Sequence, residues 1–145
     1  MSQINLAAAQ AVIAAALAHG RAQGLLPLAV AVLDARGALV AYAAEDGSSL
    51  RRQDIAMAKA NGALAMGLGS RTLAKRAQGA PQFFDALSHV ILGGLAPAPG
   101  GVLVRDAGGA LLGAVGVSGD VSANDEAAAL AGIASVGLVG DPGAD

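Results

Sequence analysis

The 145-residue sequence contains no cysteine and no tryptophan, and its only aromatic side chains are two phenylalanines and one tyrosine. The absence of cysteine excludes disulfides, cysteine-ligated zinc, iron–sulfur clusters and thiol nucleophiles. Any chemistry therefore depends on the remaining polar and charged side chains and on the backbone.

Charged residues are also scarce, at 14% of the chain, with nine basic against eleven acidic residues and a formal net charge of -2. Such a chain has no positive field that would gather nucleic acid or anionic lipid, so we expect neither nucleic acid nor a membrane as a partner. The hydrophobic fraction is 54%, which excludes intrinsic disorder because enough apolar surface is available to offset the entropy of ordering.

Long hydrophobic runs are missing too, although the mean hydropathy is +0.57. The most apolar segments, residues 25–33 and 127–140, fall short of the roughly 18 residues that a membrane-spanning helix requires. The first residues lack the basic segment of a secretory signal, which predicts a cytoplasmic protein. So few charges on a small domain leave apolar surface that a monomer cannot cover, so we expect a homo-oligomer.

The first part of the chain has the pattern of an amphipathic helix over about residues 5–23. Apolar residues recur there at three- and four-residue spacing, Asn5 or Ser2 is a suitable N-cap, and Gly24 is a natural stop.

The middle of the chain predicts three further helices. The apolar spacing over residues 55–66 indicates a helix with Lys59 near its inward edge. Ser70 is a suitable cap for a short helix, and Pro81 suits the first turn of the next one.

Two pairs of β-prone segments predict two hairpins, residues 28–33 with 39–42 and residues 102–106 with 111–117. Each pair is joined by a turn sequence that contains glycine. After the second hairpin, Ser122 and Asp125 have the spacing of a capping box for a last helix, and residues 140–145 have the composition of a frayed tail. Without β-α-β alternation, this order predicts an α+β fold with an antiparallel sheet in a single domain, residues 1–145.

Four segments, VAVLDARG, EDGSS, DIAMAKA and GGVLVRDAGGALLGAVGVSGDVSANDE, occur in the order typical of the GlcG/HbpS family, which the chain resembles along nearly its whole length. The resemblance implies a profilin-like sandwich, with an antiparallel sheet of about five strands and helices on both faces, assembled into symmetric oligomers. It also implies haem binding, which is the family's label.

Haem iron takes an axial ligand from histidine, methionine, tyrosine or cysteine, and this sequence offers no clear one. His19 and His89 are near the ends of predicted helices, where capping or surface roles account for them. Tyr42, Met57 and Met66 suit core packing. The sequence therefore leaves the cofactor unknown, with haem as the one candidate.

The segment that ends the second hairpin carries more chemical information. Gly113, Gly116 and Gly119 leave one path along the backbone open, and the following helix start offers unpaired N–H groups that suit a carboxylate or phosphate. An alternative is that these glycines only allow a helix to pack closely on the sheet. Lys59 favours the ligand interpretation, because a cation on an apolar helix face requires a negative partner.

The partner of Lys59 could be Asp46, Asp120, Asp125 or Glu126, or a ligand. The resemblance carries over the Asp46-Gly47 pair, Lys59 and the Ser118-Gly119-Asp120 segment. The sequence departs from the family pattern before Asp46, where Ala44 and Glu45 stand in place of Arg-Met; Arg51 and Arg52 follow and can restore positive charge. The candidate ligand-binding residues are Asp46, Gly47, Arg52, Lys59, Gly116, Ser118, Gly119, Asp120 and Asp125.

Two functions remain open from the sequence. The first is a protein that binds a small anionic molecule, haem or another tetrapyrrole included, between Lys59 and the GVSGD segment. The second is a cofactor-independent isomerase, hydratase or lyase for a small oxygenated acid, with Lys59, Asp120 and Glu126 as catalytic acid–base groups. Oxygen-rich residues 120–126 could also suggest a metal, but a helix cap explains them more simply, so no metal site is predicted.

Overall fold

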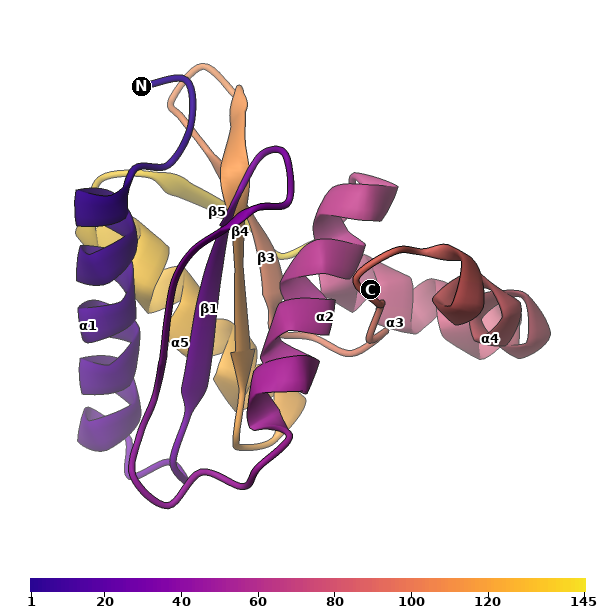
Figure 1. Cartoon of the computed structure of the whole chain (residues 1–145), viewed down its shortest axis with the longest axis horizontal. Helices are drawn as coiled ribbons and strands as arrows, with labels where there is room; N and C mark the ends of the chain where they lie inside the picture. Colours follow the sequence, from indigo (N-terminus) through magenta and orange to yellow (C-terminus); the bar gives the residue numbers. More distant parts are fainter.

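The computed structural model describes all residues, 1–145, as a five-stranded sheet with helices on both faces (Figure 1). The helices are α1 (Leu6–Ala22), α2 (Arg52–Met66), α3 (Ser70–Gly79), α4 (Pro81–Val90) and α5 (Ser122–Ser135), and the strands are β1 (Ala29–Asp34), β2 (Leu39–Ala44), β3 (Gly101–Arg105), β4 (Leu111–Ser118) and β5 (Val139–Asp141). All neighbouring strands are antiparallel, in the order β2-β1-β4-β3-β5. The predicted α+β class, sheet and two helical faces are confirmed.

Helix α1 begins and ends as its sequence predicts. The Asn5 side chain accepts a hydrogen bond from the Ala8 N–H at 2.9 Å, which satisfies a donor that the helix cannot pair. Gly24 follows the last turn with a φ of 67°, the left-handed conformation that glycine tolerates. The apolar side of α1 packs with α5 over one face of the sheet, where both contribute to the main core.

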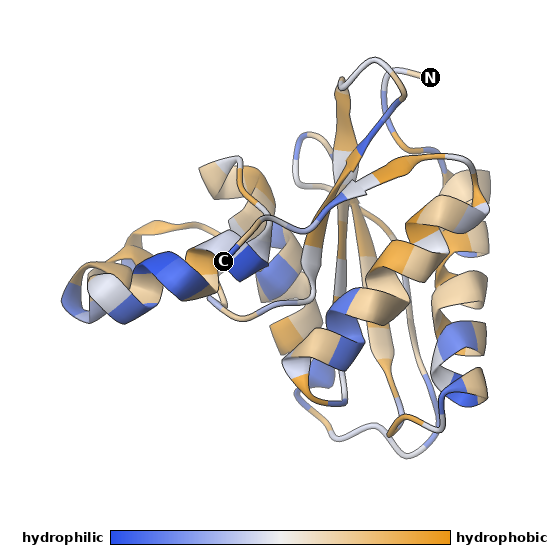
Figure 2. Ribbon diagram, turned by 180° about the vertical axis from the view of Figure 1, so that it is seen from behind, coloured by the Kyte–Doolittle hydropathy of each residue, from blue (hydrophilic) through white to orange (hydrophobic).

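Strand β1 lies inside the sheet between β2 and β4 and is buried along its whole length, which explains its apolar run from Ala29 to Leu33. Strand β2 is an edge of the sheet, and its residues are exposed or half-buried. In Figure 2 the strands are predominantly hydrophobic, as is expected of a sheet with helices on both faces.

Helix α2 covers the other face of the sheet (Figure 1), and its backbone lies very close to the backbone of β3 and β4. A side chain at Gly116 of β4 would collide with the Ala56 carbonyl oxygen of α2, and one at Gly101 of β3 would collide with the backbone of Lys59. Glycine is therefore required at both positions for this approach.

The C-terminal residues are ordered, so the predicted frayed tail is wrong. Residues 139–141 pair with β3, the Pro142 carbonyl accepts from the Arg71 N–H at 3.2 Å, and Thr72 exchanges two hydrogen bonds with Ala144. The segment is too short to show a strand pattern, and its order comes from partners distant in sequence.

Two predicted helix caps are also wrong. Gly69 precedes α3, while Ser70 accepts a hydrogen bond from the Gly101 N–H at 2.7 Å. Val121 precedes α5 without a side-chain cap, so Ser122 does not form the predicted capping box. The spare hydroxyl of Ser70 is used between elements instead of within its helix.

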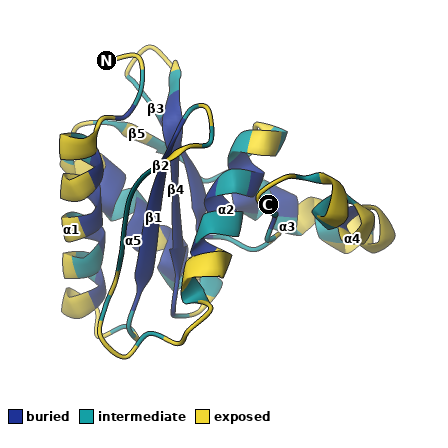
Figure 3. Cartoon of the chain, viewed as in Figure 1, coloured by how far each residue is buried: buried dark blue, intermediate teal, exposed yellow.

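Helices α3 and α4 extend away from the sheet as an arm, which we define as residues 67–99 (Figures 1 and 3). The arm has a small core of its own, in which Leu73, Phe84 and Leu95 are buried. No helix of the protein is long and apolar enough to cross a membrane.

Candidate ligand site at one end of the sheet

Three loops meet at the end of the sheet where α1 stops and α2 and α5 begin, at the bottom of Figure 1. They are residues 23–28, 45–51 and 119–121, and we call these loops, together with the adjoining end of β4 (Ser118) and first turn of α2 (residues 52–55), the loop end. The Leu26 N–H donates to Asp120 at 2.9 Å, and Gly47 and Gly119 both pack against Pro27. The structure thus brings together most of the sequence-predicted site residues, namely Asp46, Gly47, Arg52, Ser118, Gly119 and Asp120.

Asp120 holds two of these loops together. Besides Leu26, its carboxylate accepts from the Val121 N–H and the Asn124 side chain, both at 2.8 Å. These hydrogen bonds lower the pKa of Asp120, that from Leu26 most of all. The carboxylate therefore stays ionised at neutral pH, and its oxygens are already occupied.

Lys59 is buried as predicted, with 3% of its surface exposed, and its negative partner belongs to the same chain. Its ammonium group donates to the Val117 carbonyl at 2.9 Å and to Asp125 Oδ2 at 3.1 Å. Gly100 leaves the space that the ammonium group occupies, because a side chain there would lie 2.9 Å from Nζ. Of the four carboxylates considered from the sequence, Asp125 is the one that pairs with Lys59.

The Lys59–Asp125 pair joins the two helical layers, because Lys59 comes from α2 and Asp125 from α5. Burial lowers the pKa of Lys59 and raises that of Asp125, while the attraction between the two charges opposes both shifts. Asp125 also accepts from the Asp120 N–H at 2.9 Å. Through these hydrogen bonds to the Val117 carbonyl and the Asp120 N–H, the buried pair fixes the backbone at the loop end.

Glu126 is not brought together with Lys59. Its carboxylate forms a bidentate ion pair with the Arg71 guanidinium of α3, with the shortest contact at 2.9 Å. Arg71 also binds Asp145, so this cluster fastens α3 and the C-terminal residues to α5.

Arg52, the first residue of α2, is the basic residue of the loop end that lacks a carboxylate partner. It is half-buried, and its guanidinium donates to Ser118 Oγ at 3.2 Å. Ser118 is completely buried on β4. A sequence reading can nominate both residues, but only the fold shows that a strand end and a helix start 66 positions apart are in contact.

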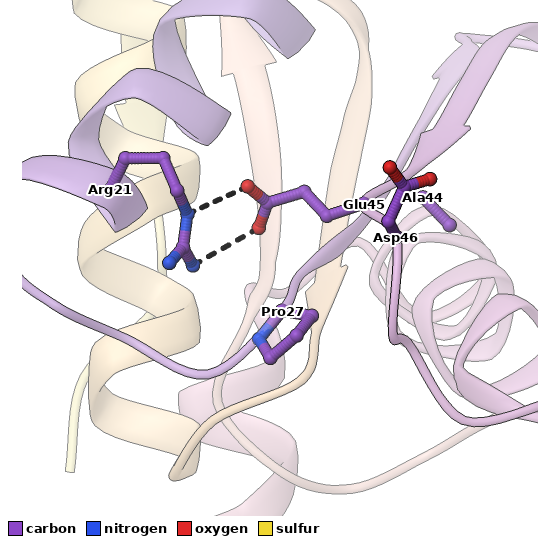
Figure 4. A pocket seen from close by; sticks show the side chains of 5 residues that line it. All are labelled: Arg21, Pro27, Ala44, Glu45 and Asp46. Carbon is purple, nitrogen blue, oxygen red and sulfur yellow. Dashed lines mark hydrogen bonds and ion pairs between the residues drawn. The ribbon is translucent and has the colours of Figure 1, made fainter.

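The largest cavity, about 420 Å³, opens beside the loop end (Figure 4). It is lined by Arg21, Pro27, Ala44, Glu45 and Asp46. Arg21 and Glu45 form an ion pair at 2.7 Å, and Glu45 also accepts from the Leu28 N–H. In Figure 4 the Asp46 carboxylate points away from this pair.

Sequence reasoning missed Arg21 and Glu45 as residues of this end. The one signal for Glu45 was its unusual place before Asp46, and nothing in the sequence linked it to a helix end more than 20 residues earlier. A second cavity, about 330 Å³, lies in the arm between α3, α4 and the loop at Pro97. Neither cavity is lined by Lys59.

Four large apolar side chains are exposed at the loop end. They are Leu26, Leu50, Ile55 and Val121, of which Leu50 is 80% exposed. On the α2 side of the sheet, Tyr42 and Met57 are half-buried against the alanines of β1 and α2. The loop end thus combines apolar surface with one unpaired guanidinium.

The sequence matches the family model described as "Haem degrading protein HbpS-like" over residues 4–134. The chain belongs to the HbpS-like family. A comparison with curated proteins returned no match.

Solved structures of similar proteins share the whole fold. The crystal structure of HbpS is 30% identical, with 92% of this chain and 90% of that chain covered and a TM-score of 0.79. The PduOC:heme complex is 23% identical, with 94% and 96% covered and a TM-score of 0.83. Klebsiella pneumoniae protein ORFY is 23% identical, with 94% and 92% covered and a TM-score of 0.84.

Proposed function

We propose that this protein is a non-catalytic binder of haem or a closely related tetrapyrrole, which it holds at the loop end. The observation that carries the proposal is membership of the HbpS-like family over residues 4–134. The structural likeness to PduOC, a protein solved with haem, agrees with it at the level of the fold.

The chemistry of the loop end fits such a ligand. A tetrapyrrole presents a flat apolar ring and carboxylate side chains, and haem adds an iron that takes a protein ligand. The exposed Leu50 and Val121 side chains offer apolar surface, and Arg52 offers a cation. Lys59 does not contact the ligand in this proposal; with Asp125 it holds the Gly119–Asp120 backbone in place.

Two residues of iron-ligating type, Tyr42 and Met57, lie on the α2 side together with Arg52. Burial raises the pKa of Tyr42, and the Asp54 carboxylate adds to this effect, so the phenol keeps its proton and is the weaker ligand. We therefore propose Met57 as the residue that would hold the iron.

The enzyme alternative is not favoured. Lys59 is enclosed and paired with Asp125, and Glu126 is bound by Arg71. Asp120, which accepts three hydrogen bonds, is a poor proton acceptor because its pKa is lowered. No two of the three proposed catalytic groups face a common cavity.

Titration of the purified apoprotein with haem tests the proposal. We expect a saturable shift of the Soret band with one haem per chain, because a protein ligand to the iron and apolar contacts with the ring change its electronic environment. Met57→Leu is expected to change the spectrum of the bound form, and Met66→Leu, a residue at the other end of α2, is the matched control.

A titration without saturable Soret change would refute haem binding. His19 lies in the last turn of α1, a helix on the opposite face of the sheet from Met57. If His19→Ala altered the spectrum and Met57→Leu did not, the ring would lie on the α1 side and the proposed position would be wrong.

A further inference from the structure

The protein pairs most of its positive charges internally. Six of the nine basic residues lie within ion-pair distance of a carboxylate. Of the other three, Lys75 and Arg76 are exposed on α3, where water solvates them. Arg52 is the remaining one, and it is half-buried.

A half-buried guanidinium normally has an anionic partner, because it gives up part of its hydration. No carboxylate of the chain forms an ion pair with Arg52, because Asp54 pairs with the neighbouring Arg51 and Asp125 pairs with Lys59. The one hydrogen bond of its side chain goes to the neutral hydroxyl of Ser118. The charge of Arg52 also helps to lower the pKa of Lys59, so two cations lie close enough to repel each other.

A second unmet polar group lies in the loop that leads into Arg52. Ser48 Oγ is the one buried side-chain polar atom of the protein without a hydrogen-bond partner. Ser48 is four residues before Arg52, in the turn where the Ser49 carbonyl accepts from the Arg52 N–H at 3.2 Å. Buried polar groups are rarely left unpaired. Ser48 and Arg52 therefore both await a polar partner from outside the chain.

We infer that Arg52 and Ser118 form a carboxylate-recognition subsite, which holds an acidic side chain of the bound ring. The guanidinium uses one N–H group on Ser118 and keeps others for a bidentate contact with a carboxylate. Ser118 is fully buried and accepts from Arg52, so its part in the subsite is to orient the guanidinium toward the carboxylate. The inference rests on the proposed function, because it assumes that a tetrapyrrole is the ligand.

The test compares haem with haem dimethyl ester, in which both carboxylates are masked, on the wild-type protein and on Arg52→Met. We expect the wild type to bind haem roughly tenfold to a hundredfold more tightly than the ester, the usual range for one charge-assisted contact. Arg52→Met should bind the two compounds equally, and Ser118→Ala should reduce the preference.

Arg51→Met is the matched control, because it removes the same charge one residue away from an exposed side chain that already pairs with Asp54. It should keep the wild-type preference for haem. Arg52→Lys, which keeps the charge and loses the planar fork, should fall between the wild type and Arg52→Met. Circular dichroism checks that each variant is folded. If Arg52→Met is unfolded, Arg52→Lys takes its place in the comparison.

The outcomes separate the two proposals. If the wild type binds neither compound, the proposed function fails. If the wild type binds both compounds equally, or if folded Arg52→Met and Arg52→Lys both keep the wild-type preference, haem binding stands and the subsite is wrong. A loss of preference in Arg51→Met equal to that in Arg52→Met also overturns the subsite, since general positive charge would then explain the effect.

Discussion

At the scale of single residues, the main result is that Lys59 is neutralised from within. The sequence shows that a lysine on an alanine- and glycine-rich helix face needs a partner. It does not show which partner, because Asp125 lies 66 residues away on a helix that packs on the opposite face of the sheet. The burial of Lys59 was therefore predictable, while the identity of its partner required the fold.

Removing one member of this pair should destabilise the protein much more than removing both. Lys59→Met leaves a buried carboxylate without its cation, and Asp125→Leu leaves a buried ammonium, so each should cost about 3–5 kcal/mol in the free energy of unfolding. The double variant should recover most of that loss. Urea unfolding of the four proteins measures the coupling, and additive losses in the double variant would contradict the interpretation.

At the scale of elements, the two hairpins use the same turn. Asp34, the last residue of β1, accepts from the Arg36 and Ala38 N–H groups, and Asp106, which follows β3, accepts from the Gly108 and Ala110 N–H groups. An aspartate that bonds the backbone two residues on favours a tight turn. The paired turns explain why both hairpins could be predicted from sequence alone.

Asp34→Ala should lower the free energy of unfolding at pH 7 by about 1–3 kcal/mol, because two part-buried hydrogen bonds from backbone N–H groups to its carboxylate are lost. The ion pair with Arg36 and these hydrogen bonds lower the pKa of Asp34 below its usual value. The Asp34 contribution is thus fully present above the unfolded pKa of about 3.9 and is lost as the pH falls through the folded value. Urea unfolding at pH 7 and at pH 3 or below should show the wild-type advantage shrinking with acidification.

Arg36→Ala separates the ion pair from the turn. The Arg36 side chain is 75% exposed, so its removal should lower the free energy of unfolding much less than Asp34→Ala does, because water screens an exposed ion pair. If Arg36→Ala were as damaging as Asp34→Ala, the ion pair rather than the turn would be the source of stability.

Elements that rely on distant partners were the ones that the sequence did not reveal. The periodicity of α1 and α2 and the glycine turns are local signals, and they predicted those helices and both hairpins. Strand β5 is three residues long and exists because β3 offers it a free edge. Likewise, Arg21 and Glu45 join only because α1 and β2 end at the same place.

At the scale of the whole molecule, the protein divides into a body with a large core and an arm with a small one. The main core contains 16 buried hydrophobic residues, while the arm core contains three. The arm also exposes Phe83, Val90 and Leu92, the last at 95%. Uncovered apolar side chains gathered on a projecting element are typical of an interaction surface.

The predicted homo-oligomer should therefore depend on the arm. Sedimentation velocity at micromolar concentration is expected to show an assembly larger than 13.9 kDa, and the double variant Val90→Lys/Leu92→Lys should dissociate it. Leu6→Lys, at an exposed position on α1, is the control and should leave the assembly intact. A wild-type protein that sediments as a monomer would refute the prediction.

The two borders of the sheet differ in a way that has its own consequence. On one border, β5 stops after three residues at Pro142, whose missing N–H and occupied carbonyl prevent further pairing. On the other, β2 presents six uncharged residues without proline. An incoming strand therefore finds a six-residue template beside β2 and only a three-residue template beside β5, so pairing of β2 with β2 is the favoured route for two chains to join by strand addition.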